Sequence, residues 1–264
     1  SFNRNKVLSL NDDEPSLASR VNWGNFNNAY PYIAIPGHPI AMFYGHIFDG
    51  VYQYTDFDKV GESYILKDGV PNNGNAREKI QPGDIKFKDI NRDGVVNDYD
   101  LTIIGNPNPK HIGGFGNNFQ YKNFHLNVFF QWSYGGDVLN ANRIEFEGGD
   151  PNARTSLNMF ASFANRWTPE NQTNELYRIG GQGPAVYSSR TIEDGSFLRL
   201  KTVSLGYRLP NAWLKKINIK SLRVYASAQN LITWTRYSGP DPVVSTRPTA
   251  LTPSFDWSTS PRPR

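Results

Sequence analysis

The sequence has no cysteine among its 264 residues, so disulfide cross-links, thiolate metal sites and cysteine nucleophiles are excluded. No stretch approaches the roughly eighteen consecutive apolar residues that a transmembrane helix needs. The start of the chain shows no charged region followed by an apolar one, as a signal peptide would. The formal net charge of +4 is small and the basic residues are scattered along the chain, so we expect no nucleic-acid binding.

Patterns typical of enzymes are also missing. The four histidines show no metal-ligand spacing, and there is no serine nucleophile elbow, phosphate-binding glycine loop or HExxH sequence. Glu145, Glu147 and Asp150 are close in sequence. A glycosidase pair, however, is defined by its separation across a cleft, and acids clustered on a loop are usually solvated. We therefore expect no catalysis.

The chain is rich in glycine, proline and aromatic residues, with 23 Gly, 18 Pro and 14% aromatics against only 38% hydrophobic residues. This composition favours many strands joined by turns. The length allows one large all-β unit or two small domains. Both ends of the sequence resemble cuts through a longer protein.

Alternation with a period of two residues recurs in the second half and predicts two pairs of long strands. IGGFGNNFQY and NFHLNVFFQWSY, joined by Lys122-Asn123, form the first pair, a hairpin in which Phe129 breaks the pattern. FLRLKTVSLGYRLP and SLRVYASAQNLITW form the second pair, with one short helical turn expected within residues 210–220. Each strand is about ten residues long, apolar on one face and polar or glycine-rich on the other, as in a membrane barrel.

A soluble β-sandwich strand shows the same alternation, so the pattern alone leaves both architectures open. Three details favour a barrel. The strands exceed the usual length of about five or six residues, aromatics such as Tyr121, Trp132 and Tyr207 stand near their ends, and the opposite faces are too polar for a sandwich core.

KDINRDGVVNDYD, residues 88–100, places oxygen-bearing side chains at the spacing of an EF-hand calcium loop. Counted from Asp89 as position one, the matching residues are Asn91 at three, Asp93 at five, Gly94 at six, Val95 at seven, Asn97 at nine and Asp100 at twelve. The flanks carry Pro82, Gly83, Gly105 and Pro107, which break helices, so we expect a free-standing clip between extended segments. We predict calcium here; a polar turn that binds no ion is the alternative.

Residues 140–191 form a long polar segment between the strand pairs, with one helix expected around residues 156–167. Loops of this size in compact domains are usually functional. In a membrane barrel such a loop lies on the extracellular side, because the other side carries short turns.

Several stretches together resemble the C-terminal part of SusC/RagA-type TonB-dependent receptors, the outer-membrane nutrient importers of Bacteroidetes-type bacteria. They are NRNKVLSL, GHPIAMFYGHIFDGVYQ, PGDIKFKDINRDGVVNDYDLTIIGNPNPK, GGFGNNFQYKNFHLNVFFQWSYGGDV, SFLRLKTVSLGYRLP and LRVYASAQNLITWT, in the family's order.

The resemblance implies an all-β fold: the C-terminal strands of an antiparallel transmembrane barrel of about 22 strands with long extracellular loops. It further implies a bacterial outer-membrane location, a SusD-like surface lipoprotein as partner, and energy from TonB through an N-terminal part outside this sequence. Residues 1–264 would then be a partial barrel domain lacking the plug, the first barrel strands and the final strand. Residues 83–109 would be a calcium-loop-like insertion, and residues 140–191 an extracellular loop.

The expected function is therefore import of glycan or peptide fragments, with the rest of the receptor and outer-membrane lipid as further partners. The alternative is a secreted, calcium-stabilised β-sandwich that binds polysaccharide. Trp167 and Tyr237 lie in polar sequence surroundings and are candidate ligand contacts. The residues expected to face the barrel lumen are Gly114, Gly116, Asn118, Gln120, Asn127 and Gln131, of which the four amides are candidate ligand contacts.

Overall fold

The chain divides into two compact units in a computed structural model that describes residues 1–2, 4–11, 14–21, 29–148, 158–185, 187–215, 218–246 and 249–257. The first, called here the sheet unit, comprises Ser1–Arg4, Asn108–Gly136 and Asp194–Ser238. The second, called the core unit, comprises Asn5–Pro107, Asp137–Glu193 and Gly239–Arg264. Residues 83–107 and the whole 140–191 segment belong to the core unit.

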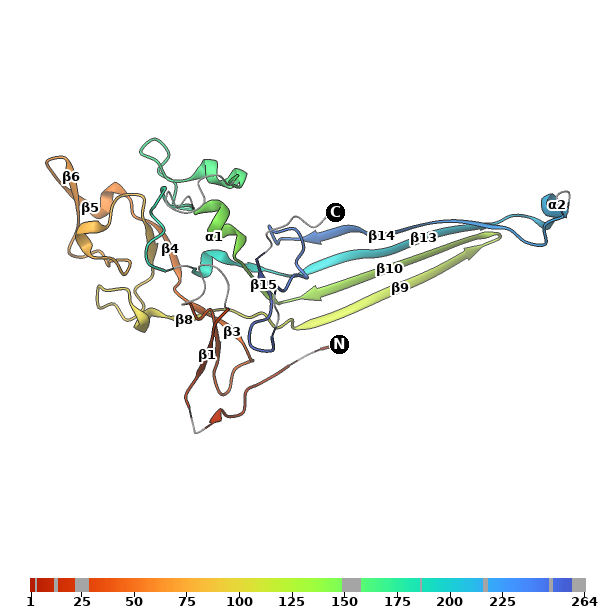
Figure 1. Cartoon of the computed structure of the whole chain (residues 1–264), viewed down its shortest axis with the longest axis horizontal. Coiled ribbons are helices and arrows are strands. Elements are labelled where there is room, and N and C mark those ends of the chain that lie inside the picture. The colour runs from red at the N-terminus through yellow and green to blue at the C-terminus, as the bar shows by residue number, and fades with distance from the viewer. Residues whose placement is uncertain are drawn as a thin grey trace. The chain divides into compact units, whose positions relative to one another are not determined.

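Four long antiparallel strands make up the sheet unit (Figure 1). They are β9 (His111–Tyr121), β10 (Phe124–Tyr134), β13 (Phe197–Arg208) and β14 (Arg223–Thr235), in the spatial order β14-β13-β10-β9. Both predicted strand pairs are confirmed. At 11 to 13 residues each, the strands are longer than the roughly five or six residues of an average strand.

The two connections at one end of these strands differ in length: residues 122–123 join β9 to β10, and residues 209–222 join β13 to β14. Lys122 and Asn123 join β9 to β10, and Lys122 takes the left-handed conformation that two-residue hairpin turns require, with φ of 51°. The connection from β13 to β14 contains the short helix α2 (Asn211–Leu214), which confirms the expected helical turn.

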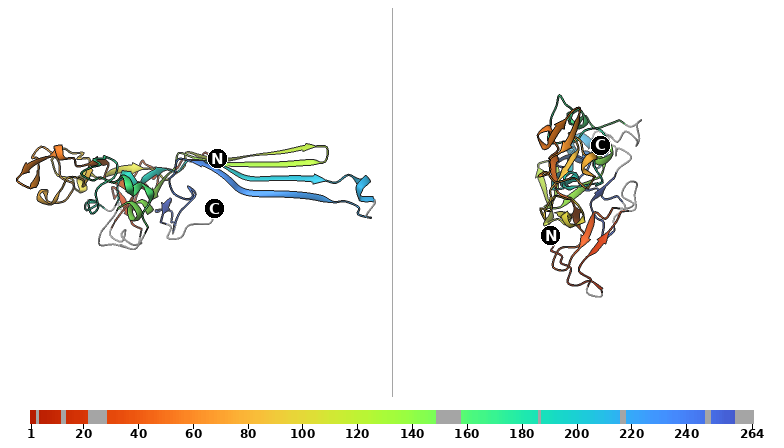
Figure 2. Two further views of the ribbon diagram at one scale, coloured as in Figure 1. Left: turned by 90° about the horizontal axis from the view of Figure 1, so that it is seen from above. Right: turned by 90° about the vertical axis from the view of Figure 1, so that its left-hand side faces the viewer.

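Apolar and polar residues form separate rows across the four strands. Phe119, Leu126, Leu205 and Ala226 are register partners in one row, and the adjacent row is Asn118, Asn127, Ser204 and Ser227. Successive residues of a strand point to opposite faces, so the two rows lie on opposite faces of the sheet. The four strands run side by side as one sheet, which can be followed in Figure 1 and in the left-hand view of Figure 2.

The spacing between two apolar rows grows from strand to strand. Val128 and Phe130 are two residues apart on β10, their partners Val203 and Leu200 are three apart on β13, and the next partners, Ala228 and Ile232, are four apart on β14. Each register shift is a bulge, and bulges bend a strand and increase its twist.

The core unit consists of short strands and single helical turns. Its elements are β1 (Leu17–Ser19), β2 (Tyr32–Ala34), β3 (Met42–Gly45), β4 (Phe48–Val51), η3 (Tyr54–Asp56), β5 (Phe57–Val60), β6 (Ser63–Leu66), η4 (Arg77–Lys79), β7 (Ile85–Phe87), η5 (Asp98–Asp100), β8 (Thr102–Gly105), β11 (Asp137–Asn140), α1 (Asn142–Glu147), η6 (Ala161–Asn165), η7 (Ser189–Thr191), β12 (Ile192–Asp194) and β15 (Phe255–Asp256). They pair into sheets β1-β2-β3-β8, β12-β11-β15, β4-β7 and β5-β6.

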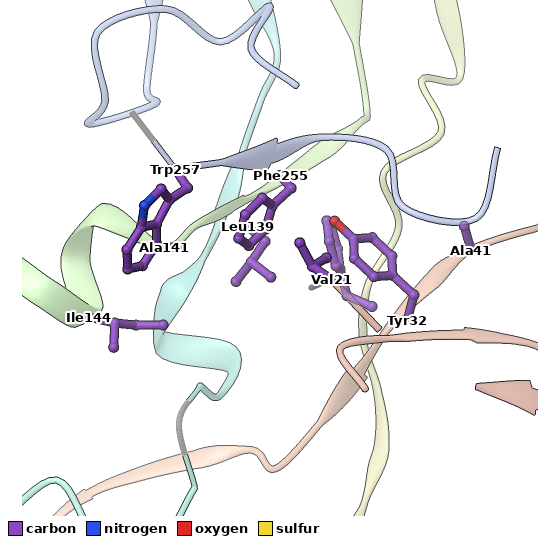
Figure 3. Close-up of a cluster of buried hydrophobic side chains, with 9 residues drawn as sticks. Val21, Tyr32, Ala41, Leu139, Ala141, Ile144, Phe255 and Trp257 are labelled. Carbon is purple, nitrogen blue, oxygen red and sulfur yellow. The ribbon is translucent and has the colours of Figure 1, made fainter. Parts of the chain in front are cut away.

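Three clusters of buried apolar side chains hold the core unit together. The first brings together residues distant in sequence, among them Tyr32, Leu139 and Phe255 (Figure 3). The hydroxyl of Tyr32 donates a hydrogen bond of 2.8 Å to the carbonyl of Pro253, so the buried phenol keeps a partner. The other clusters centre on Phe87 with Trp167, and on Tyr52.

The helix predicted around residues 156–167 is not what the structure shows. Residues 156 and 157 lie outside the described part of the chain, and between residues 158 and 167 the only helical stretch is the short η6. The side-chain amide of Asn171 donates to the carbonyls of Asn165 and Arg166, which satisfies groups that a continuing helix would otherwise bond. No described helix is long and apolar enough to cross a membrane.

Candidate functional site

The residues predicted to face the lumen share one face of the sheet unit. Gly114, Gly116, Asn118 and Gln120 pair with Gln131, Phe129, Asn127 and His125 respectively. The side-chain amide of Asn127 donates to that of Asn118 at 2.6 Å. This face therefore presents amides that donate and accept hydrogen bonds, a surface suited to a hydrated, polar solute.

A shallow hollow of about 280 Å³ marks this polar face. Its polar lining comes from all four strands: Asn118, Gln120, His125, Asn127, Ser204 and Arg223. Near the other end of the strands, Arg199 donates from Nε to the hydroxyl of Thr233 at 2.9 Å. The polar face thus has arginines as well as amides.

Phe129, which breaks the alternation in the sequence, lies on the polar face over two glycines. A Cβ at Gly114 would come within 2.7 Å of the Phe129 ring, and one at Gly116 within 3.3 Å. The ring covers backbone that glycine leaves bare, and Gly114 has no room for a side chain. Phe129 therefore fills space on the polar face.

The opposite face exposes its apolar side chains. Phe115 and Phe119 are each 56% exposed and Leu205 is 49% exposed. Among the described residues, none of the three buried clusters includes a residue of β9, β10, β13 or β14. No part of the chain that the structure describes forms a second layer against these rows, which is the arrangement a lipid-facing barrel wall requires.

Aromatic side chains gather near both ends of the apolar face. At one end the Trp132 indole donates to Nδ1 of His111 at 3.1 Å, and the His111 ring stacks on Tyr134. At the other end, the rings of Phe124 and Tyr207 lie 4.6 Å apart. Rings with a polar edge at the two ends of an apolar band are typical of the interfacial girdles of membrane barrels.

Comparison with known proteins agrees with this geometry. The chain is 35% identical over 247 residues to TonB-dependent receptor P3 of Formosa agariphila, covering 94% of this chain and 23% of that protein. It is 31% identical over 170 residues to TonB-dependent receptor SusC of Bacteroides thetaiotaomicron, covering 63% of this chain and 16% of SusC. No family model matches the sequence.

Solved structures give the same result for the fold. The RagAB peptide transporter superposes with a TM-score of 0.66 over 97% of this chain and 24% of that one, at 23% identity. The chain is a segment of a SusC-type TonB-dependent receptor. It spans about a quarter of the length of P3 and of the RagAB chain.

This assignment confirms the predicted β-barrel fold and the bacterial outer-membrane location of the receptor segment. The alternative, a secreted β-sandwich, is wrong because the apolar rows of the sheet unit have no packing partner among the described residues.

Trp167 and Tyr237 do not lie where a ligand contact was expected. Each side chain is only 5% exposed. The Trp167 ring packs in the second buried cluster, 5.5 Å from Tyr54, and its indole N–H donates to Oε1 of Gln53 at 3.0 Å. Because neither ring has an open face, the expectation that they are accessible stacking platforms is wrong.

In the Asp-rich loop, residues 88–100, the aspartate side chains accept hydrogen bonds from the backbone of the loop itself. Asp89 accepts hydrogen bonds from the amides of Arg92 and Gly94 at 2.6 and 2.8 Å. Asp100, which is fully buried, accepts from the amides of Ile90 and Asn97 at 2.7 and 2.9 Å. The first and last acids of the predicted calcium set therefore close the loop into one turn.

Between these two acids, three side chains of the loop accept hydrogen bonds from backbone amides of the loop. Asn91 accepts from the Asp93 amide, Asp93 accepts from Val95, and Asn97 accepts from Tyr99. β7 precedes the loop, η5 forms its last three residues and β8 follows it, which confirms a clip between extended segments. Among the described residues, no three His, Cys, Asp or Glu side chains lie together as a metal site. A calcium ion in this loop would also be bound by amide and carbonyl oxygens.

A buried ion-pair network joins α1 to the long segment that follows it. The Glu147 carboxylate accepts from Arg143 at 2.9 Å, from Arg190 at 2.7 Å and from the Ser162 hydroxyl at 2.6 Å. Burial opposes ionisation, but the hydrogen bonds from Ser162 and Arg190 and the charges of Arg143 and Arg190 hold the pKa of Glu147 below its ordinary value. The network ties α1, η6 and η7 to one another within the 140–191 segment.

The sequence pattern did not reveal Arg199 and Thr233 as residues of the polar face. The bulge at Lys201 shifts the alternation by one residue, so polar-face positions are odd-numbered before it and even-numbered after it. The signal is present in FLRLKTVSL, where Leu198 and Leu200 are followed by Val203 and Leu205.

Proposed function

We propose that this receptor segment supplies wall strands and outer loops to an outer-membrane nutrient importer that takes up glycan or peptide fragments. The observation that carries the proposal is the sheet unit, with a bare apolar face and a polar face of amides and arginines. A wall of this kind separates lipid from an aqueous path. The relatives, all named TonB-dependent receptors, support the same role.

Substrate and partners follow from the resemblance. The structural neighbour RagAB is described as a peptide transporter. A peptide and an oligosaccharide fragment both carry amides or hydroxyls that the polar face can bond. We propose a SusD-like lipoprotein as the partner that delivers the substrate, and TonB as the energy source acting through the rest of the receptor. In this proposal the substrate is bound and then passes inward when the plug moves, without covalent chemistry.

An uptake experiment tests the proposal. Cells lacking the complete receptor should fail to accumulate a labelled oligosaccharide or peptide mixture, and the restored receptor should recover uptake only when TonB is present. Uptake that is unchanged without the receptor would refute import. Each fraction of the mixture tested separately identifies the substrate class.

The polar face provides the residue-level test. Replacing both Asn118 and Asn127 by Leu should slow uptake, because a solute loses the paired amides. The matched control is Asn117→Leu, next to Asn118 but on the opposite, apolar face of the sheet. If both variants transport at the wild-type rate, these amides are not on the path.

We also propose calcium as the ligand of the Asp-rich loop, formed by Asp89, Asn91, Asp93, Asn97 and Asp100 with the carbonyl of Val95. The spacing of oxygen atoms and the closed turn of the loop support it.

Calorimetry on the purified receptor tests the calcium site and should show calcium binding. Asp93→Asn should weaken this binding on the order of tenfold, because one ligand charge is lost. Asp98→Asn, an exposed neighbour outside the ligand set, should leave binding unchanged. Absence of binding heat at millimolar calcium would refute the site.

A further inference from the structure

Lysine, arginine and acidic residues are divided very unevenly between the two units. The sheet unit has eleven of the 28 basic residues but only one of the 24 acidic residues, Asp194. Asp194 precedes β13, whose first residue, Phe197, pairs with Ser133 and Thr235. This end of the strands is opposite the β9–β10 and β13–β14 connections. The end that carries these two connections therefore has positive charge and no carboxylate of its own unit.

Exposed apolar side chains stand beside these charges. Trp213 in α2 is 62% exposed and Ile219 is 41% exposed, whereas Leu214 between them is buried. The connection thus encloses one apolar residue and turns two others outward. Figure 1 shows this connection extending past the β9–β10 turn.

Three of the described lysines at this end have no carboxylate partner. Lys122 lies 5.4 Å from the ring of Tyr121, itself 70% exposed. Lys215 and Lys220 flank Ile219 and are exposed. Among the described residues none of the three forms an ion pair. We call the set Tyr121, Lys122, Trp213, Lys215, Ile219 and Lys220 the turn-end surface.

This surface is continuous with the lipid-facing side of the sheet. Tyr121 pairs directly with Phe124, and the Phe124 ring contacts Tyr207 on the next strand. Indole and phenol rings prefer the level of the lipid headgroups, and lysine side chains extend from there to reach phosphate. An acidic protein partner would account for the charge but not for the continuity with the apolar face.

We propose that the turn-end surface binds anionic phospholipid headgroups in the leaflet that the β9–β10 and β13–β14 connections face. The tryptophan and isoleucine insert at the headgroup boundary, and the three lysines bond the phosphates. The proposal rests on the membrane-barrel fold and not on import, so a receptor that transports nothing would still show it.

Quenching by bromine-labelled lipids in vesicles containing the complete receptor tests the proposal. The Trp213 signal is the fluorescence difference between the wild type and Trp213→Phe. At equal mole fraction, brominated phosphatidylglycerol should quench this signal about fivefold or more beyond brominated phosphatidylcholine, since one lysine near an anionic surface alone contributes about that factor. In about 1 M salt, where the Debye length is about 3 Å, the preference should largely disappear.

Neutralising the lysines supplies the residue-level control. The variant Lys122→Gln, Lys215→Gln, Lys220→Gln should lose the preference while keeping the heat-modifiable mobility of a folded barrel. The matched control is the triple variant Lys59→Gln, Lys79→Gln, Lys88→Gln, which changes three exposed lysines of the core unit. One of them, Lys59, also lies over a tyrosine ring. This control should keep the preference for the anionic lipid. Equal quenching by both lipids, no quenching by either, or a preference that survives loss of the three lysines would overturn the proposal.

Discussion

The two units place large apolar side chains in opposite ways. In the core unit Phe43, Tyr52 and Phe255 are fully buried, whereas in the sheet unit Phe115, Phe119 and Leu205 are about half exposed. Removing apolar side chains from water stabilises both arrangements. The two units differ in what surrounds these side chains instead of water. The core unit uses its own side chains and the sheet unit uses lipid, so a similar content of apolar residues leads to two architectures.

The units also differ in charge. The sheet unit has eleven basic residues and one acidic residue, whereas the rest of the chain has 17 basic and 23 acidic residues. The basic residues look scattered along the sequence, and only the division into units reveals their segregation. The small net charge of the whole chain therefore conceals two oppositely charged parts.

The largest effect is expected from opening a cavity in the core unit. Phe43→Ala should lower the local free energy of unfolding by about 3–5 kcal/mol, because the ring is fully buried beside Tyr32. Hydrogen exchange in the complete receptor should accelerate in β2 and β3 and remain slow in β10. Tyr99→Ala, at an 83% exposed position of the same unit, should change exchange little. If both substitutions accelerated exchange equally, the contrast between buried and exposed aromatic residues in this unit would be wrong.

A smaller effect is expected from placing charge on the lipid side of the sheet. Val128→Arg should cost about 2–4 kcal/mol, since a guanidinium in the apolar band loses hydration. Asn127→Arg, one residue away on the polar face, should cost much less. Urea unfolding in lipid vesicles, followed by heat-modifiable mobility, measures both. If the costs are equal, the two faces do not differ in solvent.

Removing the Glu147 charge should have a comparable or smaller effect. At neutral pH, Glu147→Gln should lower the local free energy of unfolding by about 1.5–3 kcal/mol, because hydrogen bonds to a buried charge are lost. The pKa of Glu147 is lower in the folded state than its ordinary value of 4.5. Its contribution is therefore complete above that value and is lost as the pH falls below it. Hydrogen exchange of α1 should distinguish variant from wild type at pH 7 and hardly at all in strong acid. The exposed Glu170→Gln is the control.

The smallest effect is expected at Trp167. Trp167→Phe removes the bond to Gln53 and should cost about 0.5–1.5 kcal/mol, seen as faster exchange around η3. Substrate capture by the complete receptor should stay at the wild-type level, because the ring is buried. Loss of capture with unchanged exchange would restore the ligand role that the structure argues against.

The long strands were predictable because eleven or more alternating residues leave little choice of secondary structure. The turn at Lys122-Asn123 followed from the spacing of the two apolar runs. The bulges did not follow, since a shift of one residue between neighbouring strands depends on pairing partners that the local sequence does not contain. Arg199 was missed for this reason.

The core unit was much less predictable. Its strands are two to four residues long, too short for a period to be recognised. Trp167 illustrates the difficulty: its sequence neighbours are polar, but its ring packs against Tyr54 and so close to Gly83 that a Cβ there would come within 2.4 Å. Burial of this kind depends on residues far away in the chain. The Asp-rich loop was recognisable because its spacing is local; calcium binding there stays a prediction.

The spacing of two, three and four residues between the same two apolar rows limits how this wall can change in evolution. Deleting a residue from a regularly alternating stretch, such as Leu126, would turn every side chain on one side of the deletion to the other medium, so that hydrocarbon would meet amides and the aqueous path would meet leucines. Lys201 is different, because without it Leu200, Thr202 and Val203 would alternate directly against β10. Single-residue insertions and deletions should therefore survive at the bulges and be lost elsewhere in these strands.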